Sequence, residues 1–72
     1  AMQRKLENEL HKTEERITQL ETQIKELEAE MAKPEVAVIS AKVMELHTLA
    51  AQKEEELEAL YVKWEELTEA GV

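Results

Sequence analysis

The sequence contains no cysteine, no phenylalanine and no aspartate, and it has only one proline and one glycine among its 72 residues. Without cysteine, the chain can form neither a disulfide nor a thiolate metal site. Aromatic residues make up 3% of it, and no apolar run approaches the roughly 20 residues that a membrane-spanning helix needs. No segment reads as a secretory signal peptide. These absences favour a single domain of charged, regular helix.

Charge and apolar content point to the same class. Charged residues make up 36% of the chain, hydrophobic residues make up 43%, and the net charge is -8. This composition is typical of coiled coils. Every acidic residue is a glutamate, which forms helices better than aspartate does. The acidity argues against non-specific binding to phosphates, although it does not exclude a local basic face.

Apolar residues recur at alternating intervals of three and four on both sides of Pro34. This spacing predicts two helices that pack by knobs-into-holes contacts. When the helices are paired antiparallel, the two residue numbers in each layer add up to 70. The predicted layers are Gln3–Leu67, Leu6–Trp64, Leu10–Leu60, Thr13–Leu57, Ile17–Lys53, Leu20–Ala50, Ile24–Leu46, Leu27–Val43 and Met31–Ile39. The expected fold is all-α, an antiparallel two-helix coiled-coil hairpin.

The predicted domain covers residues 1–72, with a first helix over 3–32, a tip over 33–39 and a second helix over 40–69. Pro34 ends the first helix because a residue that precedes proline avoids the helical region. Ser40 is the expected N-cap of the second helix, and Gly71 is its expected stop. The basic start and acidic end both oppose the helix dipole. We therefore expect the sequence to be a piece of a longer protein.

Charged residues beside the seam support this pairing. Three predicted pairs across the helices join opposite charges: Glu9 with Lys63, Arg16 with Glu56, and Glu30 with Lys42. Such pairs contribute little energy but specify the alignment. A lysine within the seam, Lys53, also helps to specify register or oligomeric state. We expect a monomeric hairpin rather than a dimer, although a swapped dimer satisfies the same pairs.

Packing along the seam is expected to be uneven. The central layers combine small or polar residues, among them Thr13, Ala50 and Lys53. The layers towards the tip and towards the open end are built from larger apolar side chains, with Trp64 as the anchor of the open end. The sequence therefore predicts a weakly packed middle between two better packed ends.

No residue cluster indicates catalysis. The run Glu54, Glu55 and Glu56 points in three directions on a helix, as expected for a solvated face. His11 and His47 are not opposite each other in the predicted alignment, so each is expected to be a surface histidine. The chain also lacks a glycine-rich phosphate loop and metal-ligand spacing. We expect no enzyme activity, no catalytic residue, no metal site and no cofactor in this domain.

One surface stripe differs from the rest of this acidic chain. The outward b and c heptad positions of the first helix hold only one acidic residue, Glu26. Four basic residues of the stripe are candidate contacts to a nucleic-acid backbone: Arg4, Lys5, Lys12 and Lys25. The first three are its densest part. The alternative interpretation is charge balance on a solvated face.

The sequence resembles the C-terminal coiled-coil domain of ABC-F family ATP-binding proteins, the Uup-like proteins. The resemblance covers essentially the whole chain. It rests on the tip Pro34-Glu35-Val36, the closing stretch Tyr61-Val62-Lys63-Trp64-Glu65-Glu66-Leu67, and the distance between Pro34 and Trp64. Lys33 stands where the family commonly has aspartate, so this chain lacks that capping residue at its tip.

The resemblance implies a non-catalytic C-terminal module appended to upstream ATP-binding cassettes, which would carry the ATP, the Mg²⁺ and the ATPase activity. It further implies a cytoplasmic, ribosome-associated parent with no membrane-spanning segment. DNA or ribosomal RNA would be the partner, because the tail domain of Uup-like proteins is associated with DNA binding. The alternative function is a purely structural coiled-coil spacer or protein-docking arm.

Overall fold

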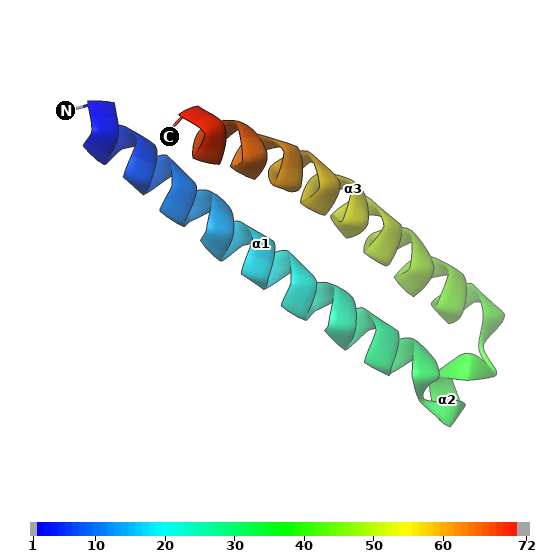
Figure 1. Ribbon diagram of the computed structural model, residues 1–72. Helices are drawn as coiled ribbons and strands as arrows, with labels where there is room; N and C mark the ends of the chain where they lie inside the picture. Colours follow the sequence, from blue (N-terminus) through cyan, green and yellow to red (C-terminus); the bar gives the residue numbers. More distant parts are fainter. Residues whose placement is uncertain (1, 71–72) are drawn as a thin grey trace.

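The computed structural model describes residues 2–70, with the side chains of residues 4–70, and it is an all-α hairpin. Three helices follow one another: α1 (Met2–Ala32), α2 (Pro34–Ala37) and α3 (Ser40–Ala70). The long helices α1 and α3 lie antiparallel along their whole length, and α2 forms the tip (Figure 1). The resulting ribbon measures 54 × 14 × 14 Å. The predicted all-α hairpin is confirmed.

The break between α1 and α2 follows from the single proline. Lys33 adopts an extended conformation (φ -65°, ψ 131°), and Pro34 takes the first position of α2, where its missing N–H costs nothing. Lys33 makes no side-chain hydrogen bond to cap α2. Its Nζ instead lies 2.9 Å from a carboxylate oxygen of Glu30. The start of α2 is therefore without a side-chain cap.

The tip differs from the predicted Met31–Ile39 layer. Ile39 is 52% exposed, whereas Val36 is only 9% exposed. The short helix α2 turns Val36 inward, and the backbone N–H of Ile39 donates to the Val36 carbonyl at 2.9 Å. The apolar residue that closes the tip is therefore Val36, because helical α2 changes which side chain faces α1. Ser40 already lies in α3 rather than before it, so the predicted N-cap is wrong by one position.

From Leu6 to Leu67, the seam uses the predicted residues of both helices. Every predicted seam residue in this span is buried or half-buried, from Leu6 to Met31 in α1 and from Val43 to Leu67 in α3. Met44 is 70% exposed and Leu49 is 39% exposed, as expected for residues outside the seam. The side chain of Gln3 lies outside the described residues, and so does the predicted stop at Gly71. The apolar spacing thus predicts correctly which face of each helix is covered.

The alignment of the two helices differs from the predicted one. The Tyr61 hydroxyl lies 3.2 Å from a carboxylate oxygen of Glu21. In the predicted alignment, where the two residue numbers of each layer add up to 70, these two residues would lie about 18 Å apart along the hairpin axis. Their side chains cannot span that distance. Leu67 lines a hollow together with Lys5, Leu6 and Glu9. We conclude that α3 lies nearer to the tip than predicted.

Burial along the seam is the reverse of the predicted pattern. The most buried seam residues lie in the middle, where Leu20 is 0% exposed and Thr13 is 4% exposed. The larger Leu60 and Trp64 nearer the open end are only half-buried. Small residues such as Ala50 let two helices approach closely, and the Thr13 hydroxyl donates to the Glu9 carbonyl at 2.8 Å. The predicted weakly packed middle is therefore wrong with respect to burial.

Candidate nucleic-acid interface

The structure brings three of the four candidate basic residues together. Arg4, Lys5, Lys12 and Lys25 are all exposed on α1. The first three lie within about three turns of the helix, at the open end of the hairpin. Lys25 follows Lys12 by 13 residues, which is about 20 Å along the axis. We call Arg4, Lys5 and Lys12 the basic cluster, and Lys25 lies apart from it.

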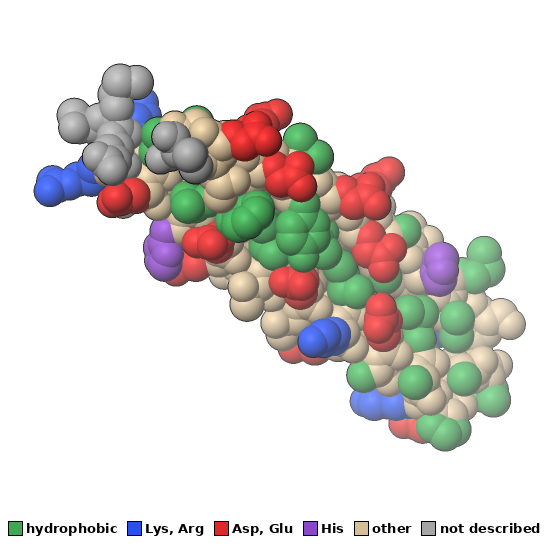
Figure 2. Space-filling view, viewed as in Figure 1, with side chains coloured by type: hydrophobic (Ala, Val, Ile, Leu, Met, Phe, Trp, Pro, Cys, Tyr) green, Lys and Arg blue, Asp and Glu red, His purple; other side chains and the backbone are tan. Residues whose placement is uncertain are grey.

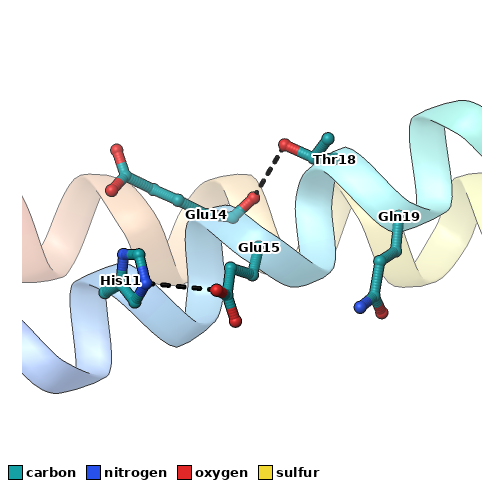
Figure 3. Close-up of a pocket in the computed structure, with 5 residues that line it drawn as sticks. All are labelled: His11, Glu14, Glu15, Thr18 and Gln19. Carbon is teal, nitrogen blue, oxygen red and sulfur yellow. Dashed lines mark hydrogen bonds and ion pairs between the residues drawn. The ribbon is translucent and has the colours of Figure 1, made fainter.

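A shallow hollow on α1 separates Lys25 from the basic cluster. It has a volume of about 510 Å³ and is lined by His11, Glu14, Glu15, Thr18 and Gln19 (Figure 3). All of these residues belong to one helix, so the hollow lies between side chains and is not a cleft between elements. His11 Nε2 lies 3.1 Å from Glu15 Oε1. The carboxylates of Glu14 and Glu15 would repel a phosphate, so the hollow is not itself a candidate site for an anion.

The outer faces of the two long helices carry opposite charge. The outward b, c and f positions of α1 hold four lysine or arginine residues and two glutamates, so their net charge is +2 with histidine neutral. The same positions of α3 hold six glutamates and no basic residue, so their net charge is -6. All these charged residues are exposed. The outer glutamates of α3 are Glu45, Glu55, Glu58, Glu65, Glu66 and Glu69. A polyanion can therefore approach only from the α1 side.

Two of the three predicted cross-helix ion pairs are present. Arg16 Nε lies 2.7 Å from Glu56 Oε2, and Lys63 Nζ lies 3.4 Å from Glu9 Oε2. The third pair, Glu30 with Lys42, is not among the contacts within 4.0 Å in the described part of the chain, since Glu30 pairs with Lys33 instead. These two pairs hold Arg16 and Lys63 within the hairpin. In the described part of the chain, no residue of the basic cluster takes part in an ion pair.

The Arg16–Glu56 pair changes the protonation equilibria of both groups. The hydrogen bond from Arg16 lowers the pKa of Glu56 below its usual value of 4.5. The same bond raises the pKa of Arg16. Each side chain favours the charged form of the other. Arg16 therefore serves to pair the two helices. It was not among the residues predicted to contact a nucleic acid.

Nothing in the described residues 4–70 forms a metal-binding group of three or more His, Cys, Asp or Glu side chains. Glu54, Glu55 and Glu56 are all exposed along α3. Two contacts between α1 and the aromatic residues of α3 were not predicted from the sequence: Trp64 Nε1 donates to Glu14 at 3.3 Å, and Tyr61 donates to Glu21. The sequence feature that could have indicated these two contacts is the row of glutamates at consecutive e positions of α1.

These features describe a helical hairpin with one basic outer surface and with no cluster of catalytic side chains in its described part. Residues 1–69 match the family model described as ABC transporter C-terminal domain. The chain belongs to this family, so it is an accessory module of an ABC protein, distinct from the ATPase cassette. No curated protein and no solved structure matches the chain significantly. Among the helices of residues 2–70, none combines the length and the apolar character that a membrane span requires.

Proposed function

We propose that this domain is a non-catalytic, nucleic-acid-directed module that holds an ABC-F ATPase on DNA or on ribosomal RNA. The observation that carries the proposal is the opposite charge of the two outer faces. Only the α1 face suits a phosphate backbone, and its basic cluster lies at the open end of the ribbon. The resemblance to Uup-like proteins supports the same partner. ATP and Mg²⁺ would bind in upstream cassettes of a cytoplasmic parent protein.

A salt-dependent titration tests the proposal. The domain is titrated with duplex DNA and with structured ribosomal RNA at about 50 and 200 mM salt. Three phosphate contacts give a slope of about -2.7 in the logarithm of the binding constant against that of salt, so a fourfold rise in salt weakens binding about 40-fold. An affinity that is unchanged by salt would contradict the proposal.

Charge-matched variants locate the surface. Arg4→Glu with Lys5→Glu is compared with Lys33→Glu and Lys42→Glu at the tip, since both double variants change the net charge equally. Lys12→Glu is compared in the same way with Lys25→Glu. We expect at least tenfold weaker binding for each cluster variant and less than threefold weakening for its control. Equal losses within each comparison would show a general effect of net charge.

The alternative function is a structural spacer or a protein-docking arm. The strongly acidic outer face of α3 is the observation that favours it, because that face repels nucleic acid. Absence of binding to DNA and RNA at about 50 mM salt would support this alternative and reject the nucleic-acid proposal.

A further inference from the structure

Both aromatic residues of the chain lie on the same edge of the ribbon. Trp64 is half-buried and Tyr61 is 41% exposed, and they lie one turn apart on α3. Each side chain reaches across to α1. The Trp64 indole N–H donates to Glu14 at 3.3 Å, and the Tyr61 hydroxyl donates to Glu21 at 3.2 Å. The two rings thus lie over the junction between the helices, partly open to solvent.

Carboxylates surround these rings. All four e positions of α1 between residues 4 and 32 are exposed glutamates: Glu7, Glu14, Glu21 and Glu28. Neither helix places lysine or arginine at an e position. Figure 2 shows hydrophobic side chains halfway along this face, with acidic side chains on both sides of them. We call Glu14, Glu21, Tyr61 and Trp64 the aromatic edge.

The opposite edge of the ribbon differs in chemistry. Its g positions mix acidic, basic and neutral residues, and two of its charge pairs are closed within the hairpin, Arg16 with Glu56 and Glu9 with Lys63. It carries no aromatic residue. Negative charge and exposed rings therefore coincide on one edge only, and the acidity of the whole chain does not account for this difference.

We propose that the aromatic edge docks an arginine-rich segment of a partner protein. A guanidinium group stacks on an aromatic face and donates paired hydrogen bonds to a carboxylate, whereas a lysine ammonium offers only a point charge. The carboxylates of Glu14 and Glu21 each accept one hydrogen bond from a ring residue, which leaves further acceptor positions free. Rings and carboxylates lie side by side, so one arginine can use both.

This surface is independent of the basic cluster. The aromatic edge repels phosphates, and the basic cluster repels arginines. The two surfaces can therefore be occupied at the same time by partners of opposite charge. The docking proposal does not rest on nucleic-acid binding, and the two are tested with different probes.

Trp64 is the only tryptophan of the chain, so its fluorescence reports binding at the aromatic edge directly. The probes are synthetic deca-arginine and deca-lysine peptides, which contain no fluorescent residue. We expect deca-arginine to change the Trp64 emission and to bind at least threefold more tightly than deca-lysine. Equal affinities would overturn the proposal, because simple charge attraction does not distinguish the two peptides.

Variants separate the aromatic edge from general acidity. Glu14→Gln with Glu21→Gln is compared with Glu55→Gln and Glu69→Gln, which lie on the outer face of α3 and change the net charge equally. The edge variant should lose at least three times as much deca-arginine affinity as the control. A smaller difference overturns the proposal. Circular dichroism checks that the variants remain helical. If the double variant does not, Glu21→Gln alone is compared with Glu55→Gln alone under the same criterion.

A variant that leaves charge unchanged completes the test. Tyr61→Leu removes an exposed ring and keeps Trp64 as the reporter. We expect about threefold weaker binding of deca-arginine and no change for deca-lysine. Unchanged deca-arginine affinity would show that the rings take no part in docking and would overturn the proposal.

Discussion

Lys53 shows how a charged residue is accommodated in the seam of this hairpin. It is half-buried, and its Nζ donates to the side-chain oxygen of Gln23 at 2.8 Å. Helical side chains lean towards the start of their own helix, and α3 starts at the tip. Lys53 therefore reaches a residue of α1 closer to the tip than Ile17, its predicted partner. The satisfied hydrogen bond removes much of the cost of the charge in the seam.

The Arg16–Glu56 pair predicts an acid-dependent loss of stability. Because Arg16 lowers the pKa of Glu56 in the folded state, the pair contributes stability above about pH 4.5, and this contribution is lost as the pH falls through the lower folded pKa. Glu56→Gln should lower the melting temperature by about 1–4 °C at neutral pH. The difference from the wild-type chain should shrink as the pH falls below 4.5 and through the lower folded pKa.

Thermal melts monitored by circular dichroism between pH 3 and pH 7 measure this effect. Glu55→Gln is the matched control, because it removes an exposed carboxylate next to Glu56. Within the described part of the chain, Glu55 takes part in no ion pair. A constant difference between the wild-type chain and Glu56→Gln at every pH would contradict the assignment.

At the scale of the elements, the apolar spacing predicted the covered faces of both long helices but not their alignment. Spacing of three and four residues fixes a stripe on each helix, whereas sliding one helix along the other brings new members of the same stripe together. The tip decides between these alignments. Val36 closes the tip because α2 is helical, and this short-range geometry was not visible in the heptad pattern.

The burial pattern of α1 and α3 predicts where the hairpin resists opening. The middle of α1, from Thr13 to Ile24, contains its most buried side chains. Backbone amides there should exchange with solvent more slowly than amides near Leu6 and Leu67, which are only half-buried, since local opening near the ends exposes less apolar surface.

Hydrogen exchange followed by NMR measures this profile residue by residue. We expect protection factors roughly tenfold or more higher in the middle than near the open end of the hairpin. Helices generally fray at their ends, so the decisive comparison is between the middle and residues 26–28, which lie at least one turn inside the end of α1. Equal protection in these two segments would show that burial does not set local stability.

At the scale of the whole molecule, the sequence predicted the class of structure and the exposure of the candidate basic residues, but not how surfaces combine. Arg4, Lys5, Lys12 and Lys25 were placed on one exposed helix face from their heptad positions. The aromatic edge was missed because it depends on contacts across the helices, and those contacts depend on the alignment that the sequence did not define. The opposite charges of the outer faces, in contrast, were already present in the sequence.

The ribbon shape also allows a test of the oligomeric state. A closed hairpin has a Cα radius of gyration of 16.3 Å and a length of 54 Å. If the chain opened at Lys33 and Pro34 and paired with a second copy, the dimer would be about twice as long, because the helices would continue in one line. We predict the closed monomer, since Val36 packs into the tip and α2 turns the chain back within a few residues.

Small-angle scattering and sedimentation equilibrium over a roughly hundredfold range of concentration decide between the two forms. A constant monomer mass, with a radius of gyration only slightly above the Cα value because of side chains and hydration, is the expected result. A mass that doubles with concentration would reject the closed monomer. Val36→Asp should shift the equilibrium towards the open form, because a charged side chain cannot close the tip without losing its hydration, whereas the same change at exposed Val38 should leave the mass unchanged.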